Sequence, residues 1–310
     1  MKRNGSAIVG RETEVAEEKW DRLVTRLDGV LDRVDRLLER STPPEVPDRV
    51  DCAGYWAFRW QKEGDSGTLI PVAHPHLVEL DDLTGIDDAK ELLVRNTAQF
   101  VAGVPANNVL LWGERGNGKS SCVKGLLTKF APRGLRLIEV QKWDLLSLPA
   151  IVDRLRGLPF RFILFCDDLS FGEGETEYRP LKPLLDGGIE ARPENLLIYA
   201  TSNRRHLMPE PMSDNTGSGE IHPEEAVSEK LSLSDRFGLT LGFSTFDQET
   251  YLEIVAHYAQ RLGVTMEGEQ LRKEAILWAL YSGRRSGRSA RQFIDDLKGR
   301  LALAETADCG

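Results

Sequence analysis

The glycine-rich run at 113–120, Gly-Glu-Arg-Gly-Asn-Gly-Lys-Ser, constrains the fold of this chain more than any other segment. It fits the pattern G-x-x-x-x-G-K-S/T, directly after an apolar stretch at 108–112 and directly before a stretch with helical periodicity at 119–130. Glycine permits positive φ and close backbone approach, so successive N–H groups can turn towards phosphates at the start of a helix. The run therefore predicts a phosphate-binding loop, and a chance glycine turn is the alternative.

Each residue type in this run has an expected task. Lys119 is expected to hold the β- and γ-phosphates of a nucleoside triphosphate, and the hydroxyl of Ser120 is expected to ligate Mg²⁺. The predicted phosphate-binding residues are the whole run and the residue after it: Gly113, Glu114, Arg115, Gly116, Asn117, Gly118, Lys119, Ser120 and Ser121.

Two carboxylates, Asp167 and Asp168, directly follow the apolar stretch at 160–166, which predicts a buried strand. Phosphoryl transfer needs positioning and charge neutralisation more than covalent chemistry. We expect Asp167 to hold the magnesium ion through water and Asp168 to polarise the attacking water. The alternative is that both aspartates cap the segment that follows the strand.

A further apolar stretch, at 196–201, ends in Ser202 and Asn203. The amide of Asn203 is expected to orient the attacking water or to contact the γ-phosphate. An asparagine that only forms a turn is the alternative.

Strand and helix patterns alternate from 81 to 246, which predicts an α/β nucleotide-binding domain with a parallel five-stranded sheet covered by helices on both faces. The expected strands are 108–112, 135–140, 160–166, 196–201 and 239–243, and a first helix is expected at 87–101. From 247 to 310 the strand patterns cease, which predicts a small all-helical domain. Its expected helices are 249–262, 269–282 and 290–305.

Residues 1–47 predict an amphipathic helix and a proline-rich linker. Apolar residues recur every three or four positions between 11 and 40, and almost all the residues between them are charged. The helix either packs on its own protein or forms a coiled coil with a partner. The prolines at 41–47 stop any helix and predict the linker.

Residues 48–80 predict an N-terminal extension that contains a hairpin or extended segment at 55–72. Its aromatic residues are Tyr55, Trp56, Phe58 and Trp60. We expect these rings to pack in a core or an interface, and a platform for stacking bases is the alternative.

Composition narrows the class of protein. The net charge of −9 argues weakly against a nucleic-acid partner, although a local basic patch can outweigh the total. The four cysteines are far apart, so neither a disulfide framework nor a zinc site is expected. The apolar stretches are shorter than the roughly 18–20 residues of a membrane-spanning helix, and the N-terminus is polar, so we expect a cytoplasmic protein.

The phosphate loop, the aspartate pair and the Ser202-Asn203 tip together resemble the AAA+ superfamily. Over residues 55–301 the chain also resembles the DUF815 family of bacterial ATP-binding proteins. The segments that carry this second likeness are 83–86, 100–113, 167–171, 201–207, 230–238 and 286–293.

The resemblance implies further roles. Arg236 matches the arginine finger that reaches the γ-phosphate held by an adjacent subunit, and Arg291 matches the sensor-2 arginine of the helical domain. For both arginines a surface salt bridge is the alternative. Ile86 matches the apolar residue that lines the adenine pocket. Asp168 stands where AAA+ enzymes usually have glutamate, which implies slower hydrolysis.

These features predict an ATPase that binds ATP or ADP with Mg²⁺ and forms a homo-oligomer, a ring of about six subunits, which remodels a protein partner. A DNA-associated loader is one alternative, because the stretch 284–300 is rich in arginine and lysine. A slow nucleotide-dependent switch is the other. The acidic insertion at 208–229 is expected to be either a flexible loop or an element that engages the substrate.

Overall fold

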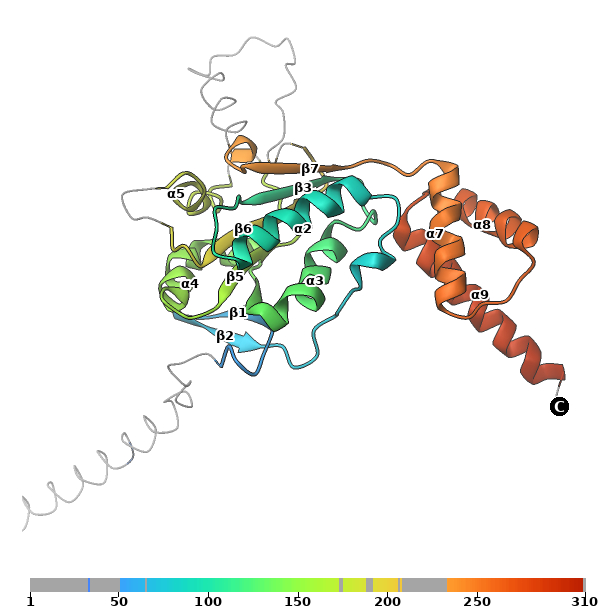
Figure 1. Ribbon diagram of the computed structural model, residues 1–310, viewed down its shortest axis with the longest axis horizontal. Coiled ribbons are helices and arrows are strands. Elements are labelled where there is room, and N and C mark those ends of the chain that lie inside the picture. Colours follow the sequence, from blue (N-terminus) through green and yellow to red (C-terminus); the bar gives the residue numbers. More distant parts are fainter. Residues whose placement is uncertain are drawn as a thin grey trace, which may run out of the picture. The chain divides into compact units, whose positions relative to one another are not determined.

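The structure is a computed structural model (Figure 1) that describes residues 33, 51–64, 66–172, 175–187, 192–205, 207 and 233–308. The predicted N-terminal helix (apart from Arg33), its linker and the acidic insertion lie outside these residues. The chain divides into two compact units, Met1–Val50 and Asp51–Gly310.

The second unit is built on one sheet with the strand order β2-β1-β4-β5-β6-β3-β7 (Figure 1). All neighbouring strands are parallel except the antiparallel pair β1 and β2. The strands are β1 Ala57–Glu63, β2 Ser66–Pro71, β3 Val109–Gly113, β4 Leu135–Glu139, β5 Arg161–Cys166, β6 Leu196–Ser202 and β7 Leu239–Phe243.

The sheet has seven strands, so the prediction of a five-stranded parallel sheet was wrong in its count. The five predicted strands all form, with ends that shift by one residue at most. The hairpin predicted at 55–72 also forms, but it joins the sheet. Ala57, Phe58 and Arg59 pair with β4, whose edge would otherwise present unpaired N–H and C=O groups. Phe58 and Trp60 are buried, as expected for rings that pack in a core.

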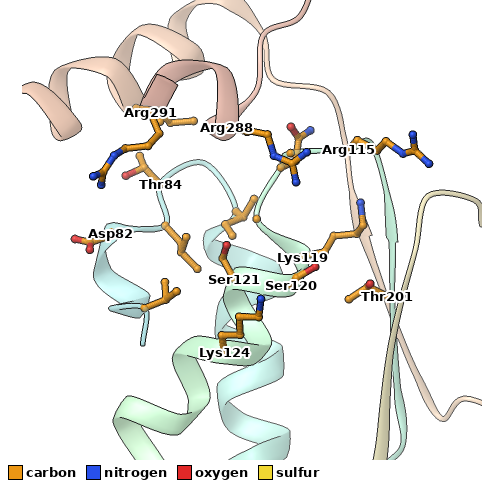
Figure 2. A pocket seen from close by; sticks show the side chains of 18 of the residues that line it. Asp82, Thr84, Arg115, Lys119, Ser120, Ser121, Lys124, Thr201, Arg288 and Arg291 are labelled. Atoms are coloured by element: carbon orange, nitrogen blue, oxygen red, sulfur yellow. The ribbon is translucent and has the colours of Figure 1, made fainter. Parts of the chain in front are cut away.

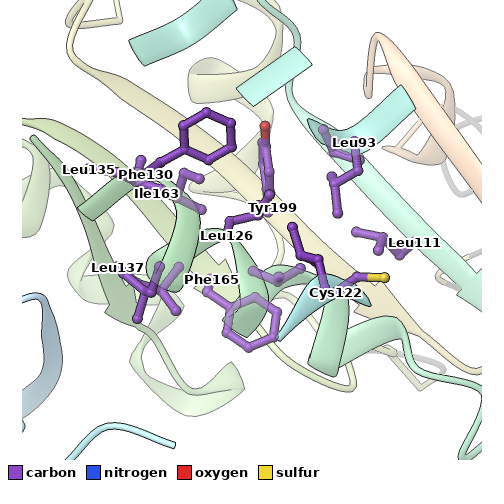
Figure 3. Close-up of a cluster of buried hydrophobic side chains, with 14 of the residues drawn as sticks. Leu93, Leu111, Cys122, Leu126, Phe130, Leu135, Leu137, Ile163, Phe165 and Tyr199 are labelled. Atoms are coloured by element: carbon purple, nitrogen blue, oxygen red, sulfur yellow. The ribbon is translucent and has the colours of Figure 1, made fainter. Parts of the chain in front are cut away.

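The central strands β5 and β6 are buried along almost their whole length because both faces of the sheet are covered there. Leu111, Ile163 and Tyr199 belong to a core cluster with residues of α2 (Asp87–Val101) and α3 (Lys119–Phe130), shown in Figure 3. The alternate strand residues Leu110, Ile138, Leu164 and Ile198 point to the opposite face and are equally buried. Both helices occupy the residues predicted for them. The remaining helices of this region are α4 Leu148–Leu155, α5 Leu181–Asp186 and the 3-10 turns Leu80–Asp82 (η1), Ala131–Arg133 (η2) and Lys142–Ser147 (η3).

Three helices follow the sheet: α7 Gln248–Arg261, α8 Gly268–Ser282 and α9 Gly287–Asp308. They share a hydrophobic cluster of their own, centred on the fully buried side chains of Tyr251, Phe293 and Ile294. Asp247 caps α7 by accepting a hydrogen bond from the amide of Thr250, at 2.8 Å. The three predicted helices are confirmed, whereas the domain boundary at 246/247 stays a prediction. No helix among the described residues is long and apolar enough to cross a membrane.

Candidate nucleotide-binding site

The glycine loop connects β3 to α3 and needs glycine at several positions for steric reasons. Gly113, Gly116 and Gly118 have φ values of 133°, 85° and 93°, which side chains rarely tolerate. A Cβ atom at Gly113 would lie 2.0 Å from the carbonyl oxygen of Phe243 on the neighbouring strand β7. No side chain caps the first turn of α3, so its amides are available to a bound anion.

Lys119, the first residue of α3, is buried against this loop with only 7% of its surface exposed. Its Nζ donates hydrogen bonds to the carbonyl oxygens of Gly113 and Glu114, both at 2.7 Å, and lies 3.3 Å from Oδ1 of Asn203. Burial lowers the pKa of the Lys119 ammonium, while the nearby Asp168 and Asp167 oppose this shift. The ammonium is therefore held at the loop by backbone carbonyls and lies beside the predicted water-orienting amide.

The carboxylate of Asp167, which follows β5, contacts side chains of α3 and of β6. The hydroxyl of Ser120 donates to Oδ1 of Asp167 at 2.6 Å, and the hydroxyl of Thr201 donates to the same oxygen at 2.5 Å. Cys166 of β5 pairs with Ala200 of β6, so the residues that follow them come together at the carboxyl ends of adjacent strands. This register brings Thr201 to Asp167, and the hydrogen bond from Ser120 places the two predicted magnesium ligands in direct contact.

Asp168 has a left-handed backbone, with φ of 52°, and no other non-glycine residue among those described has a positive φ. Its amide donates to Oγ1 of Thr201 at 2.9 Å. Its carboxylate accepts a hydrogen bond from Nδ2 of Asn203 and lies 3.8 Å from the guanidinium of Arg115. The two residues predicted to handle the attacking water are thus hydrogen-bonded to each other.

These groups open onto a cavity of about 1040 Å³, part of which is shown in Figure 2. Besides these polar groups, the cavity lining includes the apolar residues Leu83 and Ile86 and, on α7, Ile254 and Tyr258. This composition suits an aromatic base, whereas the loop end suits its phosphates.

Most of the predicted site residues line this cavity. They are Ile86, Arg115, Gly116, Asn117, Gly118, Lys119, Ser120, Ser121, Asp167, Asp168, Asn203 and Arg291. Gly113 and Glu114 lie at the root of the loop and do not line it. Arg236 does not line it either, and forms an ion pair with Asp186 at the end of α5.

Arg291 lines the cavity, but its guanidinium has partners within the helices. Its Nε lies 3.0 Å from both carboxylate oxygens of Asp295, one turn later on α9. The same guanidinium is positioned over the ring of Tyr258, 5.6 Å from the ring centre. The contact with Tyr258 joins α9 to α7.

The donor atoms at Asp167 fit a magnesium ion. Mg²⁺ binds oxygen ligands and commonly takes only one or two carboxylates, because substrate phosphates and water complete its coordination. One carboxylate and the Ser120 hydroxyl lie together at the loop. Among the described residues no group of three or more His, Cys, Asp or Glu side chains forms an all-protein metal cage.

Three features of the cavity were not predicted. Thr201 bridges the aspartate pair, and Arg288 of α9 lines the cavity beside the loop. Asp82 of η1 forms an ion pair with Arg261 of α7 at the rim. Thr201 could have been found from its place at the end of a strand next to Asn203. The other two depend on how the helices after the sheet approach the loop, which has no local sequence signal.

Most of the chain matches one known protein family. The family model is described as "Protein of unknown function (DUF815)" and matches residues 53–301. No curated protein matches the chain.

Among solved structures, the Thermotoga maritima RuvB Holliday junction branch migration motor is similar in fold, with 19% identity and a TM-score of 0.50. A second structure, of a variant of the same RuvB that carries one substitution, is similar with 19% identity and a TM-score of 0.51. In both comparisons the match covers 73% of this chain and 66% of the RuvB chain, just under two thirds.

Proposed function

Because the chain belongs to the DUF815 family and has the AAA+ fold, we propose that it binds ATP with Mg²⁺ in this cavity and hydrolyses the bond to the γ-phosphate. The hydrogen bond between Ser120 and Asp167, at the start of the loop helix, is the observation that carries the proposal. It joins the two protein groups that phosphoryl transfer needs beside the phosphates, a magnesium ligand at the start of the loop helix and a carboxylate at the end of β5.

The phosphate chain is bound by the loop amides and by Lys119. Three acceptors surround Nζ of Lys119, namely two backbone carbonyls and the Asn203 amide oxygen. They keep the lysine in position to bind the phosphate chain. Ser120 and Asp167 would hold the magnesium ion. When bound, Mg²⁺ neutralises charge that develops on the phosphate oxygens.

Asp168 and Asn203 orient the attacking water. The water oxygen forms a bond to the γ-phosphorus as the bond to the bridging oxygen of ADP breaks, and the carboxylate of Asp168 accepts the water proton. The hydrogen bond from Asn203 fixes the carboxylate for this step.

In this proposal the protein works as a homo-oligomeric ring in the cytoplasm and uses the hydrolysis cycle to remodel a protein partner. The position of Arg236 supports assembly, because this arginine lies outside the cavity of its own subunit. A finger of this kind acts on a nucleotide held by the neighbouring subunit.

The DNA-associated alternative depends on the basic residues at 284–300, some of which are engaged in other contacts. Arg291 and Arg300 are paired with acidic side chains, and Lys298 donates to the carbonyl oxygen of Leu262. Exposed pairs of this kind are worth only about 0–1 kcal/mol, so we place protein remodelling first because of the net charge of −9 and not because of these contacts.

The first prediction tests nucleotide binding and turnover separately, by calorimetry with ATP and ADP in magnesium buffer and by phosphate release. Lys119→Ala is expected to abolish binding. Asp168→Asn is expected to bind ATP like the wild type and to lose about 10²-fold or more in turnover, because the amide cannot accept the water proton. Asparagine tolerates a left-handed backbone, so this variant keeps the local fold.

Two results would contradict the proposal. One is the absence of ATP or ADP uptake by the folded wild-type protein. The other is unchanged turnover in the Asp168→Asn variant, which would mean that no proton acceptor is needed at this position.

A further inference from the structure

The first turn of α9 contacts the phosphate loop directly. The amide of Arg288 donates to the carbonyl oxygen of Gly116 at 3.1 Å. A Cβ atom at Gly116 would lie 3.0 Å from Oγ of Ser286 and 3.1 Å from Cβ of Arg288, so the two backbones are in close contact. Ser286 caps the helix by accepting a hydrogen bond from the amide of Ser289 at 3.1 Å. The position of Arg288 is therefore fixed with respect to the loop.

Two arginines on this helix line the cavity, and they differ in what their guanidinium groups contact. Arg291 is bound by Asp295 and positioned over Tyr258. Arg288 has no hydrogen-bond or ion-pair partner for its guanidinium within the described part of the chain. Figure 2 shows the Arg288 side chain towards the loop and the Arg291 guanidinium towards the side on which Asp82 and Thr84 lie.

The charge around Arg288 favours an anion. Six basic and four acidic side chains line the cavity, and Arg261 already pairs with Asp82. The side chain of Arg288 lies towards the loop, and Arg115, Lys119 and Lys124 belong to the same cavity lining. A guanidinium without a partner in a cavity with more basic than acidic side chains is stabilised when a polyanion binds there, and guanidinium groups suit phosphate oxygens.

We propose that Arg288, and not Arg291, is the arginine of the helical region that binds the phosphate chain of the nucleotide, while Arg291 joins α9 to α7. This inference rests on the proposed function. Because the Arg288 amide is bonded to Gly116, a nucleotide held by the loop and by the Arg288 guanidinium also fixes the start of α9.

The test compares Arg288→Ala, Arg288→Lys and the matched control Arg291→Ala in the full chain. ATP affinity is measured by calorimetry in magnesium buffer, and the unfolding temperature is measured without nucleotide. Arg288→Ala is expected to weaken ATP binding about tenfold or more with an unchanged unfolding temperature, since a hydrogen bond to a charged group is lost. Arg288→Lys is expected to recover part of the affinity.

Arg291→Ala is expected to do the reverse. It lowers the unfolding temperature, because its contacts with Asp295 and Tyr258 are lost, and it changes ATP affinity less than about threefold. If Arg288→Ala does not fold, Arg288→Gln, which retains most of the length without the charge, is measured in its place.

The inference is overturned if the Arg288 variants bind ATP like the wild type, or if only Arg291→Ala weakens binding. A wild-type protein that takes up no ATP would instead refute the proposed function, and the inference with it. The wild-type titration therefore distinguishes the two failures.

Discussion

At the scale of single residues, the backbone conformation of Asp168 explains why a short acidic side chain stands at this position. Its φ of 52° lies in the left-handed region, which aspartate and asparagine occupy more readily than longer side chains. The AAA+ enzymes that this chain resembles usually have glutamate at this place. Here the short side chain meets Asn203 while its amide is held by Thr201, so both contacts depend on the unusual backbone.

Removing the hydroxyl of Thr201 should affect turnover at the site more than the stability of the fold. Thr201→Val removes the donor to Asp167 and leaves the amide of Asp168 without its acceptor. We expect turnover to fall about ten- to a hundredfold, since groups that orient metal ligands usually contribute this much. The measurement is the steady-state rate of phosphate release at saturating ATP and Mg²⁺.

Thr97→Val is the matched control. Thr97 is also buried and hydrogen-bonded, to the carbonyl oxygen of Leu93 and to the hydroxyl of Tyr199, but it does not line the cavity. It is expected to lower the unfolding temperature and to leave turnover near the wild-type value. Equal losses of turnover in the two variants would show that Thr201 acts only through stability.

At the scale of elements, the hairpin of β1 and β2 completes the sheet. β1 pairs in parallel with β4, and the buried Arg136 of β4 ties the chain before β1 to the sheet by donating from Nε to the carbonyl oxygen of Cys52 at 2.5 Å. The guanidinium of Arg136 is also positioned over the ring of Phe160, 4.4 Å from its centre. Burial lowers the pKa of the Arg136 guanidinium.

The stability of the sheet should therefore depend on the hairpin. Phe58→Ala is expected to lower the free energy of unfolding by about 3–5 kcal/mol, because a fully buried ring leaves a cavity. Ile70→Ala on β2, whose side chain is 39% exposed, is expected to cost less than about 1 kcal/mol. Denaturant unfolding measures both. A small loss for Phe58→Ala would mean that the hairpin is not part of the cooperative unit.

At the scale of the whole molecule, the position of Arg236 predicts cooperation between subunits. Arg236→Ala is expected to bind ATP normally and to lose about 10³-fold in turnover, the range measured for arginine fingers. Lys119→Ala subunits cannot bind ATP but retain the finger. Mixing the two inactive variants should restore part of the activity, because a Lys119→Ala subunit provides its finger to the ATP-filled site of an adjacent Arg236→Ala subunit.

Phosphate release from the mixture, at protein concentrations that favour assembly, measures this recovery. The matched control is a mixture of Arg236→Ala with the double variant Lys119→Ala/Arg236→Ala, which should remain inactive. No recovery in the first mixture, with oligomers present, would indicate that Arg236 serves only its ion pair with Asp186.

The sequence by itself determined the glycine loop, the five strands from β3 to β7 and the helices that follow them. These features are local: a glycine pattern that permits positive φ, apolar runs that bury on both faces of a sheet, and helical periodicity are all visible within a few residues. The aspartate pair and Asn203 were likewise identified from their places at strand ends. Membership of DUF815 and the AAA+ fold are confirmed.

Only the tertiary structure decided what depends on distant segments lying together. The hairpin became part of the sheet because the edge of β4 was free to pair with it. Thr201 meets Asp167 because β5 and β6 are neighbours in register, and Arg288 reaches the loop because α9 begins against Gly116. Such contacts arise from the packing of whole elements, and the physical reason that a local pattern cannot reveal them is that their partners are many residues away in the chain.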